Sequence, residues 1–316
     1  MAVIACIVAD WGTTNLRAWA LDAEGGIVDR RESSHGLLTI ERGRFAEALA
    51  EVASGWLPAS PSSRMPVLLS GMVGSKLGWK EVPYLALPMA LDELARHIAP
   101  VESPLHAAIR IVPGVKRDDA KQPDVMRGEE TQIFGALHIL KGQDGVFVLP
   151  GTHSKWAIVE KGKLISFRTY MTGEVFGLLR RSGTLSQLME GDHHDDAAFA
   201  EGVARGASAD AGGLLHRLFS VRTLGLLDQM PRVNLASYLS GLLIGAEVRD
   251  GLAWLRLADR AGITTGIGSP AILESYRQAL RILSGADLAV IDSGDVVPPA
   301  LFSIARAAGL LTATSV

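Results

Sequence analysis

In each half of the chain, three short apolar runs follow one another with only turn residues between them. Such runs predict strands, and the short polar gaps between them favour an antiparallel meander in each half. The runs cover residues 3–9, 16–21 and 27–33 in the first half and residues 146–149, 156–160 and 164–170 in the second. The repeat predicts two domains on one plan, which we place at residues 1–140 and 141–316.

After each meander the apolar residues recur at helical spacing or gather in short continuous runs. The segment 54–66 is rich in Pro and Ser and predicts a loop. Further strands are expected at residues 67–70, 108–112, 263–266 and 289–292, and helices at residues 43–53, 91–98, 128–140, 175–181, 195–205, 212–218, 235–257, 270–283 and 296–308. The pattern is therefore typical of an α/β protein.

The composition narrows the class of protein further. Of the 316 residues, 48% are hydrophobic and 6% aromatic, as in a globular aliphatic α/β protein. A net charge of −3 without a run of Lys or Arg argues against nucleic-acid binding. The longest apolar stretch, residues 2–9, is shorter than the ~20 residues that cross a bilayer. The N-terminus lacks the pattern of a signal peptide, and the single cysteine, Cys6, is expected to be a core thiol. We therefore predict a cytoplasmic protein without a membrane partner.

The strongest candidates for chemistry are the two Gly-Thr turns that follow the first strand of each half. They read DWGTT at residues 10–14 and GTHSK at residues 151–155. Backbone N–H groups beside a glycine, together with hydroxyls, are the donors that a phosphate needs, so two such tips facing each other across a cleft would hold a nucleotide. Asp10 ends a buried strand and suits a magnesium ion. The alternative is a pair of ordinary polar hairpins, the first with an Asx turn.

Three further segments carry candidate chemistry, each with a structural alternative. The turn GIGS at residues 266–269 joins a strand to a helix, where it either meets a flat ligand or a phosphate, or merely lets Ser269 cap the helix. Glu129 and Glu130 begin a helix and serve either as base or magnesium ligand, or as capping acids. The glycine-rich apolar loop 70–79 either offers amides to a small ligand or is a surface loop.

Five longer blocks make the chain similar to the 2-dehydro-3-deoxygalactonokinases, within the actin/hexokinase/Hsp70 (ribonuclease-H-like) superfamily. The blocks cover residues 10–17, 70–75, 124–132, 149–156 and 169–174, and beyond them the resemblance rests mainly on residues 266–269. The resemblance implies two ribonuclease-H-like domains with mixed sheets flanking a nucleotide cleft. It also implies ATP and Mg²⁺ as cofactors, and phosphoryl transfer to the 6-hydroxyl of 2-dehydro-3-deoxy-D-galactonate in galactonate catabolism.

The residues and the resemblance together nominate a site. The catalytic candidates are Glu130, Glu129, Asp10 and Lys155, with Asp10 also the magnesium ligand. The ATP-binding candidates are Gly12, Thr13, Thr14, Gly151, Thr152, His153, Ser154, Gly266, Gly268 and Ser269. The candidates for binding the sugar acid are Arg17, Gly71, Met72, Val73, Gly74, Ser75, Arg127, Arg168 and Glu174.

The chain departs from the wider sugar-kinase pattern at the second turn. Many relatives carry an aspartate there as the catalytic base, whereas residues 150–155 contain no carboxylate. Glu129 and Glu130 are therefore the first candidates for the base, Asp10 the second and His153 the third. A comparable Gly-x-Glu-Glu block in the superfamily's exopolyphosphatases includes a glutamate that serves as base.

Two other functions fit parts of the sequence. A phosphatase of the exopolyphosphatase type would explain the glutamate pair but not the loop 70–79. The non-enzymatic alternative is an ATP-gated assembly or chaperone-like protein on the actin fold, against which the few insertions in the sequence argue. ADP release that depends on an acceptor separates the kinase from both. The epimer preferred as substrate and the oligomeric state, a homodimer included, stay open at this stage.

Overall fold

The computed structural model describes residues 3–41, 43–60, 64–210, 212–260 and 265–311. The described residues form two compact units. Unit 1 comprises Met1–Asp144, Ile158–Phe167 and Ser293–Val316, and unit 2 comprises Gly145–Ala157 and Arg168–Asp292.

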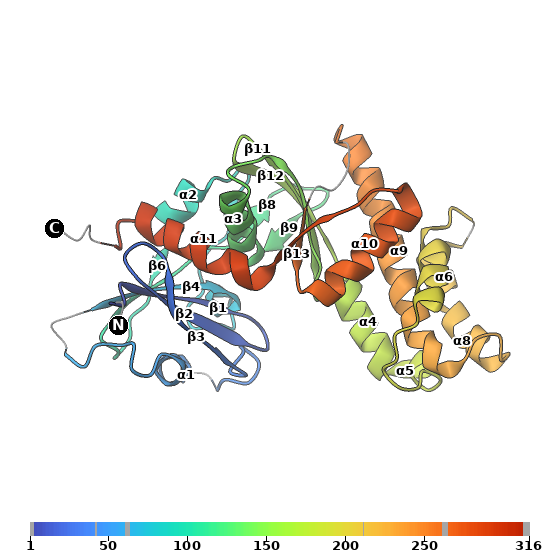
Figure 1. Ribbon diagram of the computed structural model, residues 1–316, viewed down its shortest axis with the longest axis horizontal. Helices are drawn as coiled ribbons and strands as arrows, with labels where there is room; N and C mark the ends of the chain where they lie inside the picture. Colours follow the sequence, from blue (N-terminus) through green and yellow to red (C-terminus); the bar gives the residue numbers. More distant parts are fainter. Residues whose placement is uncertain (1–2, 42, 61–63, 211, 261–264, 312–316) are drawn as a thin grey trace. The chain divides into compact units, whose positions relative to one another are not determined.

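Unit 1 contains a six-stranded mixed sheet (Figure 1). Its first three strands form the predicted antiparallel meander, and the next two add in parallel to the first of them. In spatial order the strands are β3 (Ile27–Ser33), β2 (Leu16–Leu21), β1 (Cys6–Trp11), β4 (Met65–Gly71), β7 (Ala107–Ile111) and β6 (Ala99–Pro100). The meander is therefore confirmed, with β1 beginning three residues later than the apolar run and extending to Trp11.

Helices and a small second sheet complete unit 1. The helices are α1 (Phe45–Val52), the short 3₁₀ turn η1 (Met72–Gly74), α2 (Leu91–Arg96), α3 (Glu129–Ile139) and α11 (Ser293–Ala307). The second sheet joins β5 (Leu85–Ala86), β8 (Val115–Arg117) and β9 (Asp124–Met126). The sequence pattern missed this sheet, because strands of two or three residues are too short to show a period of two.

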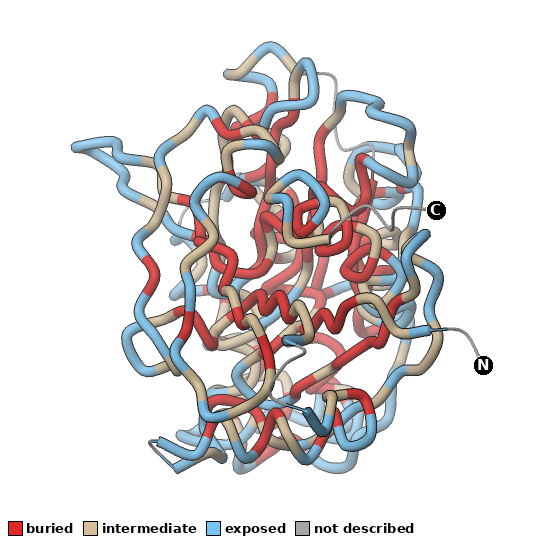
Figure 2. The backbone as a smooth tube through the Cα atoms, turned by 90° about the vertical axis from the view of Figure 1, so that its left-hand side faces the viewer, coloured by how far each residue is buried: buried red, intermediate tan, exposed pale blue. Residues whose placement is uncertain are grey.

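Aliphatic side chains from both faces of the six-stranded sheet form the core of unit 1. The central strands β1 and β4 are buried along most of their length. Figure 2 shows that the buried stretches of the chain lie in its interior and the exposed ones at its rim. Three aromatic rings close one end of this core: the Trp11 ring lies edge-on to Phe45 at 5.7 Å and to Trp79 at 6.3 Å. This packing fixes the end of β1, where the first Gly-Thr turn begins.

A five-stranded sheet repeats the plan of the first. Its order is β12 (Lys163–Tyr170), β11 (Ser154–Glu160), β10 (Gly145–Leu149), β13 (Thr265–Gly268) and β14 (Ala289–Asp292). Here too the third, second and first strands of a meander are followed by two strands that add in parallel. The predicted repeat of the strand arrangement is confirmed, although residues 263 and 264 of one expected strand lie outside the described residues.

Helices make up most of unit 2. They are α4 (Thr172–Arg181), α5 (Gly183–Ser186), α6 (Asp196–Ala207), α7 (Gly213–Leu218), α8 (Ser220–Leu226), η2 (Arg232–Asn234), α9 (Leu235–Leu257) and α10 (Pro270–Ser284). Helices α6 and α9 pack unusually closely, because a Cβ at Gly202 would lie 2.2 Å from the Tyr238 carbonyl oxygen and one at Gly241 would lie 2.1 Å from that of Phe199. Within the described residues no helix is long and apolar enough to span a membrane.

The two units differ from the predicted domains in three segments, of which the shortest is residues 141–144 in unit 1. Ile158–Phe167 and Ser293–Val316 group with unit 1, although the expected second domain runs from 141 to 316. For the C-terminal segment the reason is α11, which packs on α3 so closely that a Cβ at Gly135 would lie 1.9 Å from the Val296 carbonyl oxygen. The sequence signals a helix at this position but not its partner. The division into domains at residue 140 stays a prediction.

Candidate active site

The first Gly-Thr turn lies between β1 and β2 in unit 1. The Gly12 N–H donates to the Asn15 carbonyl over 2.9 Å and closes a tight turn. Thr13 and Thr14, at the tip of the turn, are exposed. The tip therefore presents hydroxyls and backbone N–H groups to solvent from a rigid strand, which is the arrangement that an anion needs.

A second segment, residues 34–39, packs against this tip and forms hydrogen bonds with its backbone. The N–H groups of Leu37 and Leu38 each donate over 3.0 Å, to the carbonyls of Gly12 and Thr13 respectively. The Trp11 indole donates to the His35 carbonyl over 2.8 Å. Gly36 is buried at the contact, and a Cβ there would lie 2.1 Å from the carbonyl carbon of Thr14. No local sequence pattern marks this segment, because its role depends on contacts across 20 or more residues.

We expect Gly36→Ala to lower the free energy of unfolding by about 1–3 kcal/mol, since the new methyl group can be accommodated only if the backbone of the tip moves. Thermal unfolding of the variant beside the wild type measures this. Gly177→Ala in the middle of α4 is the matched control, because the nearest atoms to its Cβ are the flexible end of Arg181 at 3.3 Å. An alanine there favours the helix, so an equal loss of stability in both variants would contradict the clash at Gly36.

Asp10 lies beside the tip, one residue before the end of β1. Its partner in the register of β1 and β2 is Arg17, so both side chains emerge on one face of the sheet. Burial raises the pKa of the Asp10 carboxyl to about 6; the nearby Arg17 charge opposes this shift and the Glu129 charge adds to it. Asp10 therefore lies within electrostatic reach of a second carboxylate from another element.

The chain brings that second carboxylate close through two glycines. Gly71, at the end of β4, has φ +93°, and a Cβ there would lie 3.1 Å from Asp10 Oδ1. Gly128, just before α3, has φ +107°, and a Cβ there would lie 3.2 Å from the Gly71 Cα. A buried hydrogen bond of 2.8 Å between the hydroxyls of Ser70 and Thr131 joins the same two elements. The N-terminus of α3 is thus fixed at the strand ends where Asp10 lies.

The two glutamates at this helix start have different surroundings. Glu130 is fully buried, and both of its carboxylate oxygens accept from the Gly128 N–H, at 2.9 and 2.8 Å. Burial, with a contribution from Glu129, raises the pKa of Glu130 to about 7. Glu129 is only partly buried, and its Oε2 accepts from the Arg127 N–H over 3.0 Å. The buried Glu130 carboxylate therefore caps the N-terminus of α3, whereas the Glu129 carboxylate remains partly accessible to solvent near Asp10.

The glycine-rich loop that follows β4 is fixed by Arg127. The Arg127 guanidinium donates to the Val82 carbonyl over 2.7 Å and lies 4.2 Å above the Tyr84 ring. A Cβ at Gly74 would lie 2.8 Å from Arg127 Nη1, so the loop passes directly over the guanidinium. Among the described residues, Arg127 Nε and Nη1 and the Ser75 hydroxyl are buried without a hydrogen-bond partner. Met72 and Val73 lie in this loop as the turn η1.

The second Gly-Thr turn lies in unit 2, and its Gly151, Thr152 and His153 are exposed. The N-terminus of α4 packs against it. The Glu174 N–H donates to the Thr152 carbonyl over 2.9 Å, and a Cβ at Gly173 would lie 2.3 Å from the Gly151 carbonyl oxygen. The α4 start is thus held against the second tip.

Charged side chains surround this second tip. His153 Nε2 and Glu174 Oε2 lie 2.5 Å apart. Lys155 is buried behind the tip, with its ammonium group donating to the His153 carbonyl over 3.0 Å. Glu174 therefore lies beside His153 in unit 2. The loop 71–75, which is another candidate for the sugar-acid site, lies in unit 1.

A cavity of about 110 Å³ lies beside the second tip, entirely within unit 2. It is lined by the residues Pro150, Gly151, Thr172, Gly173, Phe176, Ser240, Leu243, Ile244, Ile272 and Tyr276. Helix α10 contributes the last two of these residues. The expected turn at residues 266–269 is wrong in this respect, because Gly266 and Gly268 are buried within strand β13 and only the exposed Ser269 joins that strand to α10. Ser269 occupies the N-cap position without a side-chain cap hydrogen bond, so capping does not account for it.

Two further arginine candidates make contacts of their own, although among the described residues the Nε of Arg168 is also buried without a hydrogen-bond partner. Arg17 lies 3.4 Å from Glu32 on the neighbouring strand. Arg168 is in unit 2, with its guanidinium 5.2 Å from the Trp254 ring centroid. Unit 1 thus brings together Asp10, Gly12–Thr14, the loop 71–75 and Glu129. Unit 2 contains residues 151–155, Glu174 and the end of β13 with Ser269.

Carboxylates of the first site fit the requirements of Mg²⁺. This ion keeps several waters and binds through one or two carboxylates plus substrate phosphates, rather than in an all-protein cage. Asp10, with Glu129 close enough to shift its pKa, supplies that donor set next to the exposed Gly-Thr tip. The residues present therefore suit the ion.

The repeated strand order, with a Gly-Thr tip after the first strand of each repeat, defines an α/β protein of the actin/hexokinase type. The fold is shared with the activator of 2-hydroxyisocaproyl-CoA dehydratase from Clostridium difficile, at a TM-score of 0.52, 11% identity, and coverage of 96% of this chain and 95% of that one. The family model described as 2-keto-3-deoxy-galactonokinase matches residues 10–304, and the chain belongs to this family of sugar-acid kinases.

Two relatives from the same family resemble the chain over nearly its full length. The 2-dehydro-3-deoxygalactonokinase of Escherichia coli K12 is 34% identical over 301 residues, covering 95% of this chain and 97% of its own. A crystal structure assigned as a 2-dehydro-3-deoxygalactonokinase from Sinorhizobium meliloti has a TM-score of 0.87 at 32% identity, covering 98% of this chain and 99% of its own. The predicted fold class and family are thus confirmed.

Proposed function

We propose that this kinase uses ATP and Mg²⁺ to phosphorylate the 6-hydroxyl of 2-dehydro-3-deoxy-D-galactonate. The observation that carries the proposal is the junction of β1, β4 and α3, where Asp10 and Glu129 lie beside an exposed Gly-Thr tip. Family membership and the names of the relatives support the substrate. The fold relative with bound ADPNP supports the nucleotide.

Unit 1 supplies the groups for the reacting end of the substrates. The hydroxyls and amides of the tip at residues 12–14 would hold phosphate oxygens, and Asp10 would hold the magnesium ion. When bound, that ion would neutralise the negative charge that develops during phosphoryl transfer. Glu129 accepts the proton of the sugar hydroxyl as a positioned general base, because it is the accessible carboxylate of the pair.

The sugar acid itself requires a donor for its carboxylate. Arg127 is the best placed of the three arginines, since two of its guanidinium nitrogens are buried without a partner. A buried unpaired donor costs about 1–3 kcal/mol, and a bound carboxylate would satisfy it. The loop 71–75, which passes over Arg127 and carries the unpartnered Ser75 hydroxyl, would contact the rest of the molecule.

Unit 2 supplies the groups for the nucleotide. The exposed tip at residues 151–153 would hold phosphate oxygens, together with the N-terminus of α4 packed against it. Lys155 adds a positive charge behind the tip. The cavity between the tip and α10 would receive the base and sugar of ATP. The end of β13 and Ser269 lie at the start of that helix.

The proposal predicts that ADP release from MgATP depends on the acceptor. The assay compares the galactonate and gluconate epimers of the 2-keto-3-deoxy acid with glycerol, glucose and no acceptor, and mass spectrometry identifies the phosphorylated position. We expect release only with the acids, fastest with the galactonate epimer, and a product phosphorylated at O6. Equal release without acceptor would instead favour hydrolysis of the exopolyphosphatase type.

A further inference from the structure

The buried polar network around Glu247 in unit 2 belongs to no sequence motif. Glu247 lies in the middle of α9 and is 3% exposed, in a stretch that is otherwise apolar from residue 239 to residue 246 apart from Ser240. We propose that Glu247 is a positioning residue for the nucleotide: it fixes the tip at residues 151–153 relative to α10, the opposite wall of the same cavity. The proposal rests on the proposed use of ATP and concerns unit 2 alone.

Three donors from three different elements meet this one carboxylate. The Trp156 indole of β11 donates to Oε1 over 2.8 Å. The Tyr276 hydroxyl of α10 donates to Oε2 over 2.7 Å, and the Thr172 hydroxyl at the start of α4 donates to the same oxygen. Each of these hydrogen bonds is strengthened by the charge of the acceptor and by its burial.

The proton positions follow from this geometry. Because Tyr276 gives its only hydroxyl proton to Glu247, its oxygen is left to accept, and the Ser154 hydroxyl 2.9 Å away becomes the donor. The chain Ser154 to Tyr276 to Glu247 therefore has one direction. Burial raises the pKa of Glu247, while its hydrogen bonds to Thr172, Tyr276 and Trp156 lower it.

Every donor in this network lies next to the second Gly-Thr tip or in the wall of the cavity proposed for the nucleotide. Ser154 and Trp156 follow the second tip directly in β11. Thr172 precedes Gly173, whose Cα lies against the Gly151 carbonyl. Tyr276 and Thr172 themselves line the cavity. Weakening the hydrogen bonds to the Glu247 carboxylate therefore changes the distance between the tip and α10. A bound nucleotide must fit that distance.

The test uses two variants that change polar atoms and little volume, Tyr276→Phe and Glu247→Gln. We expect each to raise the KM for ATP, and the Kd for ADP measured by calorimetry, about tenfold, as expected for weakened hydrogen bonds to a charged group. The KM for the sugar acid should stay within about twofold of the wild-type value, because no residue of the network belongs to unit 1. Glu247→Leu, which removes every acceptor, should have the larger effect of the two substitutions at this position.

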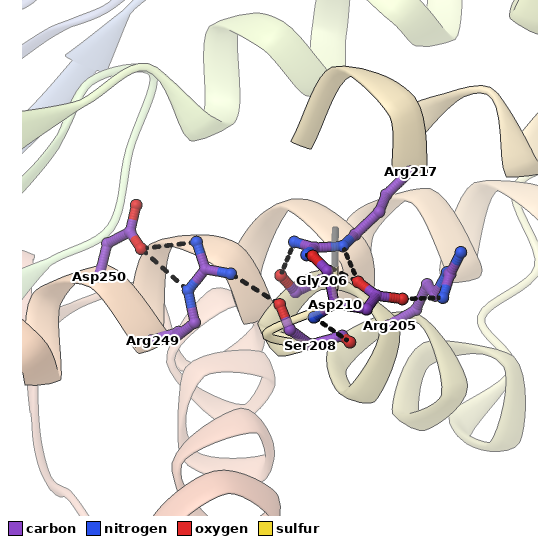
Figure 3. A network of polar contacts seen from close by, with 7 residues as sticks. All are labelled: Arg205, Gly206, Ser208, Asp210, Arg217, Arg249 and Asp250. Atoms are coloured by element: carbon purple, nitrogen blue, oxygen red, sulfur yellow. Dashed lines mark hydrogen bonds and ion pairs between the residues drawn. The ribbon is translucent and has the colours of Figure 1, made fainter. Parts of the chain in front are cut away.

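A matched control comes from another polar network in unit 2 (Figure 3). Asp210 accepts from Arg217 Nε at 3.1 Å and Nη2 at 2.9 Å, and from Arg205 Nη1 at 2.7 Å. Arg217 is 2% exposed, so Asp210→Asn leaves a buried charge with a weakened partner and should lower the Tm. None of these residues lines the cavity, and the Kd for ADP should not change.

The outcomes distinguish the proposed nucleotide site from the proposed positioning role of Glu247. If the wild type binds ADP and all network variants bind it equally well while their Tm falls as in Asp210→Asn, the network is merely structural and the positioning role is overturned. If the wild type does not bind ADP, the proposed nucleotide site falls and the positioning role falls with it. A selective loss of nucleotide affinity supports both.

Discussion

Asp10→Ala is expected to lower kcat at least about 100-fold, the loss seen when one charge-stabilising group is removed from an active site, while the fold stays intact. The proposed role gives the reason: Asp10 holds the magnesium ion at the phosphate tip. Burial raises the pKa of Asp10 to about 6, so its ionised form is disfavoured in the folded protein. At pH 8 the variant should therefore be at least as stable as the wild type, although it is inactive.

The measurement is kcat at saturating ATP across a magnesium titration, with thermal unfolding on the same samples. Asp22→Ala is a matched control in unit 1, since Asp22 accepts from the N–H groups of Glu24 and Gly26 in the turn between β2 and β3. That variant should lose stability and keep kcat. A kcat for Asp10→Ala within a few-fold of the wild-type value would rule out the magnesium role.

Local patterns predicted most of the strands and helices. The apolar spacing placed the long helix at 235–257, and α9 is observed at Leu235–Leu257. A strand ends where its backbone pairing with a neighbouring strand ends. A single apolar run in the sequence does not show that pairing. The apolar run at residues 3–9 became β1 at Cys6–Trp11, because all six residues of that strand face β2, from Leu21 back to Leu16.

Long-range contacts explain what the sequence could not predict at the site. The two Gly-Thr tips are local and could be predicted, whereas the segment around Gly36 acts through the backbone of Thr13 and Thr14. Glu247 gave one signal, a lone acid in an apolar helix, but Trp156 and Tyr276, its partners, lie far from it in sequence. Which segments pack against each Gly-Thr tip is therefore decided by the folded chain and could not be predicted from local sequence.

Neighbouring residues on a helix point about 100° apart, so the sequence could not say which of the two glutamates faces inward. The structure does: Glu130 is fully buried and bonded to the Gly128 N–H, and Glu129 is partly exposed. This difference favours Glu129 as the base, although the sequence left the two equal.

Glu129→Gln is expected to lower kcat by about 100- to 10,000-fold, the contribution of a positioned general base. The amide keeps the size of the side chain and can still accept from the Arg127 N–H, so the fold and the KM for ATP should change little. Single-turnover measurements of the phosphorylated product isolate the chemical step. Glu130→Gln is the matched comparison, since the same change is made one residue away.

Glu130→Gln should leave kcat within about tenfold of the wild type and change the pH dependence of stability instead. The pKa of Glu130 rises from its ordinary value of 4.5 to about 7 in the folded protein. The folded state therefore binds the proton more tightly than the unfolded state, so this stabilisation is complete below about pH 4.5 and is lost as the pH rises through 7. The glutamine variant lacks this loss and should gain stability relative to the wild type between pH 5 and pH 8, as measured by Tm at both values. If Glu130→Gln loses kcat and Glu129→Gln does not, the two glutamates have the opposite roles, and the buried carboxyl with the raised pKa is the base.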